Sequence, residues 1–167
     1  MDLAFTVIRL ALGLAIAAHG AQKLFGWFGG YGLAGTGGFF ESIGFRPGKF
    51  FAFAAGMGEL GGGLLTLLGL GGALGPAIIV MVMLVAILSV HVRNGFFATN
   101  QGWELNLMYI LSAASVAYAG SGAYALDGAL GLSVLNTPIQ VSIALGAAVV
   151  LALLNLMARR PAPAQAP

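Results

Sequence analysis

The sequence contains no cysteine and very few charged residues. Without cysteine the chain has no disulfides, no iron–sulfur ligation and no cysteine nucleophile. Charged residues make up 7% of the chain, whereas a soluble domain has about a quarter. These polar groups are too few to cover the surface of a folded domain in water. The net charge of +2 is also too small to indicate nucleic acid as a partner.

Hydrophobic residues, by contrast, make up 59% of the chain and gather in five long runs. A helix needs about 20 mostly apolar residues to cross a bilayer. The runs cover residues 3–25, 50–70, 77–92, 103–119 and 139–157. The sequence therefore predicts an all-α membrane protein that contacts the lipid bilayer. We expect the first run to be an uncleaved helix rather than a signal peptide.

The segment between the first two runs, residues 35–49, carries charges among aromatic side chains. Glu41, Arg46 and Lys49 alternate with phenylalanines, a pattern typical of an amphipathic segment on the membrane surface. In a five-span protein the basic loop residues gather on this same side: Arg46, Lys49, Arg93, Arg159 and Arg160. The positive-inside rule then places this side and the C-terminus in the cytoplasm.

Ionisable residues inside a span are costly in lipid and mark a functional site by default. Five of them fall in the half of the bundle next to the basic side: His19, Lys23, Glu59, His91 and Glu104. Glu59 is the deepest, roughly 14 Å into the second run at 1.5 Å per residue, and we place His91 in the last turn of the third. Four aromatic residues flank this cluster: Trp27, Phe96, Phe97 and Trp103. The sequence predicts a protonatable, catalytic cluster with aromatic substrate-binding walls.

Helical spacing places small residues on the same faces as these charges. One stripe in the first run contains Arg9, Gly13, Ile16, Gly20 and Lys23. A second stripe, in the second run, contains Ala55, Glu59, Gly62, Gly63 and Thr66. Small residues let helices approach closely in lipid. We therefore expect both stripes to face the bundle interior and the glutamate to lie near His19 or Lys23.

A structural interpretation of each charged residue stays open beside the functional one. Lys23, His91 and Arg9 lie near the ends of their spans, from which their polar groups can reach the membrane–water interface. Glu104 can complement the dipole of its own helix, and His19 can bond a backbone carbonyl. A buried network can also serve only to hold helices in register. No tightly bound metal or haem is expected, because the histidine and glutamate spacing matches no ligand motif.

Several short motifs follow one another through residues 4–130. They are Arg9-Leu-Ala-Leu-Gly13, His19-Gly20-x-x-Lys23-Leu-Phe-Gly26, Gly58-Glu59-Leu-Gly-Gly, Leu68-Gly69, His91, Asn94-Gly95-Phe96-Phe97, Gly102-Trp103-Glu104 and Gly122-x-Tyr124-x-Leu126-Asp127. In this order they resemble the DoxX family of bacterial and archaeal membrane proteins. The resemblance implies a four-helix transmembrane core over residues 1–130 in the cytoplasmic membrane. Residues 131–158 then form an additional transmembrane helix, and residues 159–167 a tail too proline-rich to pack.

The resemblance also implies a link to redox chemistry, because the name-giving relatives look like subunits of a thiosulfate:quinone oxidoreductase. It implies no particular substrate. A quinone-linked oxidoreductase subunit is the first hypothesis, with quinone as bound cofactor and electrons from a redox partner protein or a bound organic cofactor. A non-catalytic scaffold or assembly subunit is the second. A small carrier for a solute or lipid is the third.

Overall fold

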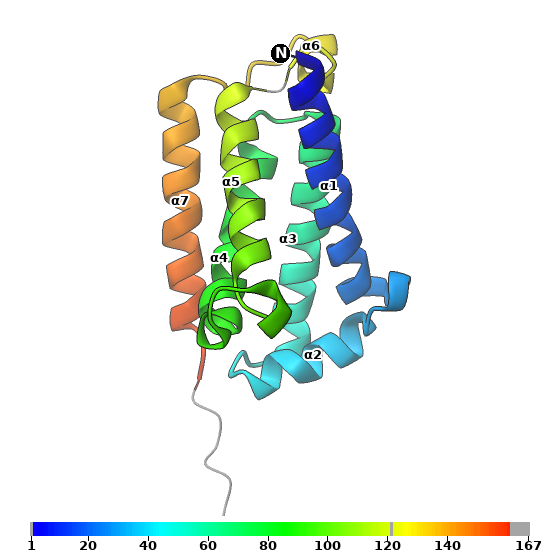
Figure 1. The fold of residues 1–167 in the computed structure, drawn as a ribbon, viewed down its shortest axis with the longest axis vertical. Coiled ribbons are helices and arrows are strands. Elements are labelled where there is room, and N and C mark those ends of the chain that lie inside the picture. The colour runs from blue at the N-terminus through cyan, green and yellow to red at the C-terminus, as the bar shows by residue number, and fades with distance from the viewer. Residues whose placement is uncertain (1, 121, 161–167) are drawn as a thin grey trace, which may run out of the picture.

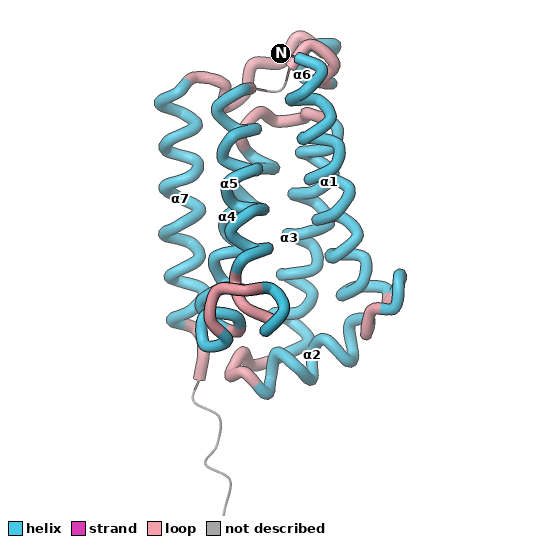
Figure 2. Tube along the Cα trace, in the orientation of Figure 1, coloured by secondary structure: helices cyan, strands magenta, loops and turns pink. Residues whose placement is uncertain are grey.

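The computed structural model describes residues 2–120 and 122–160, and every regular element in these ranges is helical (Figure 2). Five long helices run side by side along the molecule (Figure 1). They are α1 (Asp2–Phe25), α3 (Gly48–Leu68), α4 (Leu74–Ser89), α5 (Glu104–Ala119) and α7 (Pro138–Met157). The shorter elements are η1 (Trp27–Gly29), α2 (Gly32–Ser42), η2 (His91–Asn94), η3 (Ala98–Asn100) and α6 (Leu126–Ala129).

Three of these helices are long and apolar enough to cross a membrane: Leu3–Phe25 in α1, all of α3 and all of α7. Helix α4 is also apolar but has 16 residues, and α5 has 16 residues too. The five apolar runs of the sequence therefore fold as five helices in the expected order. The prediction of an all-α membrane protein is confirmed for the described residues.

Helices α1 and α3 pack closely along the two small-residue stripes. A Cβ atom on Gly20 would lie 2.7 Å from the carbonyl oxygen of Gly56, and one on Gly63 would lie 2.8 Å from that of Gly13. These neighbours are backbone atoms, which cannot move aside as a flexible side chain can. The contact between α1 and α3 therefore requires glycine at these positions. The prediction that both stripes face the interior is confirmed.

Helix α2 crosses the end of the bundle where α1 ends and α3 begins (Figure 1). It overlaps the segment that the sequence predicts to be amphipathic, residues 35–49, and begins three residues before it. Its far end is joined to α3 because Glu41 accepts a hydrogen bond from the backbone N–H of Gly48 at 3.1 Å. Phe45 is fully buried in the turn between the two helices. This turn anchors α2 over the end of the bundle.

The C-terminal end of α7 is bound to the same turn. The guanidinium of Arg159 donates hydrogen bonds to the carbonyl oxygen of Ile43 and lies 5.5 Å from the ring centroid of Phe45. The backbone N–H of Arg160 donates to the carbonyl of Gly44 at 2.8 Å. The first two residues of the predicted tail are thus hydrogen-bonded to this turn, and residues 161–167 lie outside the described part of the chain.

A separate polar cluster holds the opposite end of the bundle. Arg9 is only 3% exposed and donates from Nη2 to the carbonyl of Tyr124 at 3.1 Å. Asp127 is buried and accepts hydrogen bonds from the backbone N–H groups of Gly71 and Gly72 at 2.9 and 2.7 Å. The guanidinium is thus directed into the protein, not toward the interface. Together the two side chains bind α1 and the α5–α7 connection to the α3–α4 turn.

Candidate functional site

Two adjoining cavities lie at the end of the bundle that α2 covers. The first, of about 410 Å³, is enclosed by α2, α3, α4, η2 and the end of α7, and we call it the inner cavity. The second, of about 530 Å³, lies between α1, η1 and α2, and we call it the outer cavity. Lys23, Phe39 and Phe40 line both, so these three side chains separate one cavity from the other.

The ammonium group of Lys23 on α1 pairs with Oε1 of Glu59 on α3. The lysine side chain is 28% exposed, whereas the glutamate side chain is 3% exposed. A carboxylate in this position is tolerated only because a cation lies beside it. The close α1–α3 packing brings the two helices near enough for this contact. The expectation that Glu59 lies near His19 or Lys23 is confirmed, with the lysine as its partner.

The other carboxylate oxygen of Glu59, Oε2, is buried and has no hydrogen-bond partner among the described residues. Glu59 also lines the inner cavity. Nearly all buried polar atoms in folded proteins are hydrogen-bonded, so an unpaired carboxylate oxygen beside a cavity needs an explanation. A ligand with a hydroxyl or N–H group would satisfy it.

His91 lines the inner cavity from the end of α4. It opens η2 instead of occupying the last turn of α4, because the backbone of Val90 (φ −127°, ψ −59°) leaves the helix one residue earlier. Its Nδ1 lies 2.7 Å from the carbonyl oxygen of Gln101. A carbonyl only accepts, so Nδ1 carries the hydrogen. In the neutral ring Nε2 is then free to accept a hydrogen bond.

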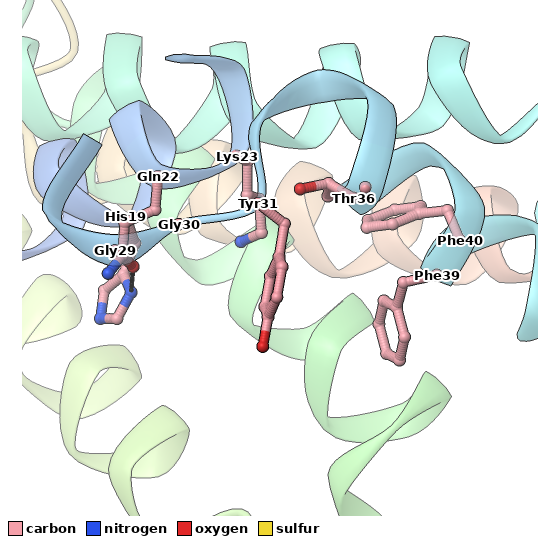
Figure 3. Close-up of a pocket in the computed structure, with 10 residues that line it drawn as sticks. His19, Gln22, Lys23, Gly29, Gly30, Tyr31, Thr36, Phe39 and Phe40 are labelled. Atoms are coloured by element: carbon pink, nitrogen blue, oxygen red, sulfur yellow. Dashed lines mark hydrogen bonds between the residues drawn. The ribbon is translucent and has the colours of Figure 1, made fainter. Parts of the chain in front are cut away.

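His19 lines the outer cavity, where Figure 3 shows its ring and the Lys23 side chain reaching to the same side of α1. Its Nδ1 lies 3.1 Å from Oε1 of Gln22, whose Nε2 donates to the carbonyl of Phe28 at 3.2 Å. This second bond fixes the amide so that its oxygen faces the histidine. His19 thus donates from Nδ1, and its ring also meets Tyr109 edge-on at 6.2 Å.

Glu104, the fifth predicted member of the cluster, lines neither of these two cavities. Its Oε2 accepts a hydrogen bond from the backbone N–H of Ala98 at 2.9 Å, which fixes the η2–η3 loop to the start of α5. The structure therefore gathers Lys23, Glu59 and His91 around the inner cavity. It places His19 beside Lys23 in the outer cavity and Glu104 in a loop contact.

The four aromatic residues expected to form substrate-binding walls also lie outside the lining of both cavities. Phe96 stacks edge-on with Trp103 at 4.9 Å and with Phe97 at 5.3 Å. Trp27 packs against Phe25 and is 59% exposed. Other aromatic residues line the cavities instead: Tyr31, Phe39, Phe40 and Phe51. Helix α2 supplies two of these, Phe39 and Phe40, which Figure 3 shows among the residues that line the outer cavity.

Two polar residues that the sequence reasoning missed, Gln101 and Asn155, line the inner cavity. Asn155 has a clear signal in the sequence, because it interrupts the otherwise apolar stretch of residues 149–157. A side-chain amide in a membrane helix is costly unless it has a partner. In the described ranges no group of three histidine, aspartate or glutamate side chains is arranged to hold a metal ion.

The model of the DoxX family matches residues 4–92, more than half of the chain. The chain belongs to the DoxX family. The family identified from the sequence motifs is therefore confirmed. Searches of curated proteins and of solved structures gave no match. The DoxX match runs from α1 to Val92 in η2, so it contains Lys23, Glu59 and His91, whereas Asn155 and the whole of α7 lie beyond it.

Proposed function

We propose that this DoxX-family protein is a quinone-binding subunit of a membrane oxidoreductase. The observation that carries the proposal is the second carboxylate oxygen of Glu59. It is buried beside the inner cavity and has no hydrogen-bond partner among the described residues. A polar group of this kind inside an apolar bundle suits a lipophilic ligand with a small polar head.

The walls of the inner cavity fit such a ligand. Most of its lining is apolar and comes from Phe39, Phe40, Phe51, Met81 and Val85, among others. Its volume of about 410 Å³ falls in the usual range for small-molecule sites, about 300–1,000 Å³. Pockets that recognise small molecules typically combine apolar walls with a few directed polar groups. A flat quinone ring has the same combination, since its carbonyl oxygens project from an apolar ring.

The polar groups around the cavity suit the proton chemistry of a quinone. Reduction of a quinone to a quinol takes up two electrons and two protons. Glu59 and His91 can hold protons at the cavity, and the Lys23 ammonium can donate a hydrogen bond to a quinone oxygen. The chain has no cysteine to ligate an iron–sulfur cluster, so the two electrons would come from a redox partner protein or a bound organic cofactor.

The same proposal includes an arrangement in the membrane. Helices α1, α3, α4 and α5 form a four-helix transmembrane core within residues 1–130, and α7 is an additional membrane helix. The end covered by α2 faces the cytoplasm of a bacterial or archaeal cell, and so does the C-terminus. The basic residues of the loops support this orientation, since all of them lie toward that end: Arg46, Lys49, Arg93, Arg159 and Arg160.

Binding of decylubiquinol, whose hydroxyl group can donate a hydrogen bond to the Glu59 carboxylate, to the purified protein in lipid nanodiscs tests the proposal. We expect saturable binding that Glu59→Gln weakens about tenfold, since one charge-assisted hydrogen bond is worth roughly 1.5–3 kcal/mol. Glu41→Gln is the matched control, because Glu41 binds the Gly48 N–H and lines neither of the two cavities. Absence of saturable binding, or equal binding by both variants, would contradict the proposal.

The scaffold hypothesis has an observation of its own, the buried ion pair at the closely packed α1–α3 contact. If this pair only fixes helix register, Glu59→Gln should lower the unfolding temperature while the native complex turns over quinone at the same rate per assembled complex. A quinone site predicts that turnover per assembled complex falls with this substitution. The measurement therefore separates the two functions.

A further inference from the structure

We infer that the C-terminal helix α7 contributes a substrate-binding residue, Asn155, which recognises the polar head of the ligand in the inner cavity. The inference rests on the proposed quinone function. It extends that function to a part of the chain beyond the stretch matched by the DoxX family, residues 4–92.

Asn155 is the one polar side chain of α7 for which the described residues provide no hydrogen bond. Gln140 belongs to the capping box with Thr137, and Ser142 donates to the carbonyl of Pro138 at 2.8 Å. The backbone carbonyl of Asn155 accepts a hydrogen bond from the backbone N–H of Ala158, and Asn155 lines the inner cavity. An amide at this place is costly in lipid unless a ligand or water satisfies it.

The end of α7 that carries Asn155 is bound to the α2–α3 turn. Arg159 lies two residues beyond the last residue of α7 and donates hydrogen bonds to the carbonyl oxygen of Ile43, which also lines the inner cavity. Asn155 is therefore held close to this turn, at the wall of the cavity. A polar group at a cavity wall can select among ligands.

The chemistry of an amide differs from that of the other polar groups at the cavity. A side-chain amide both donates through Nδ2 and accepts through Oδ1, whereas the carboxylate Oε2 of Glu59 only accepts. A quinone offers acceptors, and a quinol offers donors as well. Asn155 can thus hold the head group in both redox states, while Glu59 favours the form that carries a hydroxyl. A ligand without oxygen atoms would leave the amide unpaired and bind more weakly.

Ligand recognition and proton chemistry fall on different sides of the boundary of the family match. Lys23, Glu59 and His91 lie within the matched residues, so the groups that can hold protons come from the shared core. Asn155 comes from the helix outside the match. We therefore expect the choice of ligand to depend on α7 and the proton chemistry to depend on the core.

The test compares Asn155→Leu with Asn106→Leu, using decylubiquinone as the probe and the protein in nanodiscs. Asn106 is the matched control, because its amide lies on α5, donates to Sδ of Met83 and lines neither of the two cavities. We expect Asn155→Leu to weaken binding about tenfold, with no loss of thermal stability. The infrared carbonyl stretch of the bound quinone should also move to higher frequency, because one hydrogen bond to the carbonyl is lost.

Each outcome decides a different question. If the unmodified protein binds no quinone, the proposed function fails and the role of Asn155 fails with it. If it binds quinone and Asn155→Leu binds equally well with the same carbonyl frequency, only the role of Asn155 is refuted. Weaker binding without a change in carbonyl frequency would also refute a direct contact, because the substitution would then act through packing alone.

Discussion

The guanidinium of Arg159 donates two hydrogen bonds to the carbonyl oxygen of Ile43, from Nε at 3.0 Å and from Nη2 at 2.7 Å. This contact joins residues 116 positions apart and closes the end of the bundle. Arg159→Ala removes both bonds and the contact with Phe45. We expect amide hydrogen exchange in the α2–α3 turn to become about tenfold faster or more, since a hydrogen bond to a charged group contributes roughly 1.5–3 kcal/mol.

Arg160→Ala is the control for this prediction. Arg160 binds the carbonyl of Gly44 through its backbone N–H, a bond that alanine keeps. The substitution removes the same charge from the same end of the chain. Equal acceleration of exchange in both variants would mean that net charge, not the Arg159 hydrogen bonds, holds the turn.

The Lys23–Glu59 ion pair should respond unequally to loss of either partner. Lys23→Met leaves a buried carboxylate without its cation and should lower the free energy of unfolding by about 3 kcal/mol. Glu59→Gln leaves a lysine that is 28% exposed and should cost only about 1 kcal/mol. Thermal unfolding in detergent measures both values.

A double substitution completes this experiment. Lys23→Met with Glu59→Gln removes both charges and should regain most of the stability lost with Lys23→Met alone. If the losses of the two single variants simply add, the side chains do not interact in the membrane.

The close contact of α1 and α3 predicts a strong effect at Gly63. Alanine there would bring its Cβ within 2.8 Å of the carbonyl oxygen of Gly13 and 3.0 Å of the Cα of Ala17. The helices must separate, and we expect a loss of about 1–3 kcal/mol in unfolding free energy. Gly61→Ala on the same helix meets no atom within 4 Å and should be neutral or slightly stabilising. Equal thermal stability of the two variants would contradict the packing argument.

Asp127 predicts a stability effect at the opposite end of the bundle. Its carboxylate accepts from the backbone N–H groups of both Gly71 and Gly72. Asp127→Ala leaves these donors without that acceptor and should cost about 1–3 kcal/mol, measured by thermal unfolding. Asp127→Asn keeps one acceptor oxygen and should cost less. Equal losses in the two variants, both of which lack the charge, would show that the charge of Asp127 matters more than its two backbone contacts.

The interior position of Glu59 could be predicted from the sequence. The helical repeat places Glu59 on a face of small residues, and a carboxylate is too costly to expose to lipid. A carboxylate deep in an apolar run must face the interior, and the small residues on its face show which helix surface packs closely. The same reasoning placed Glu59 near His19 or Lys23, and the structure shows Lys23 as its partner. These inferences use only the spacing of residues along a single helix.

The residues that line the cavities could not be predicted from the spacing along single helices. Glu104 and the aromatic residues near it lie next to the cluster in sequence order, but the η2–η3 loop folds back so that Glu104 binds Ala98. Which aromatic residues cover the cavity depends on the path of α2 across the bundle, which no local pattern specifies. Asn155 reaches the site only because the end of α7 docks on the α2–α3 turn.

The short length of α4 suits its position among the other helices. Its 16 residues span about 24 Å, whereas the hydrocarbon core of a bilayer is about 30 Å thick. Helix α4 packs against α3, α5 and α7, so protein covers much of its surface in place of lipid. A helix covered in this way can end early without leaving its backbone groups in hydrocarbon. His91 and the inner cavity lie at this early end of α4.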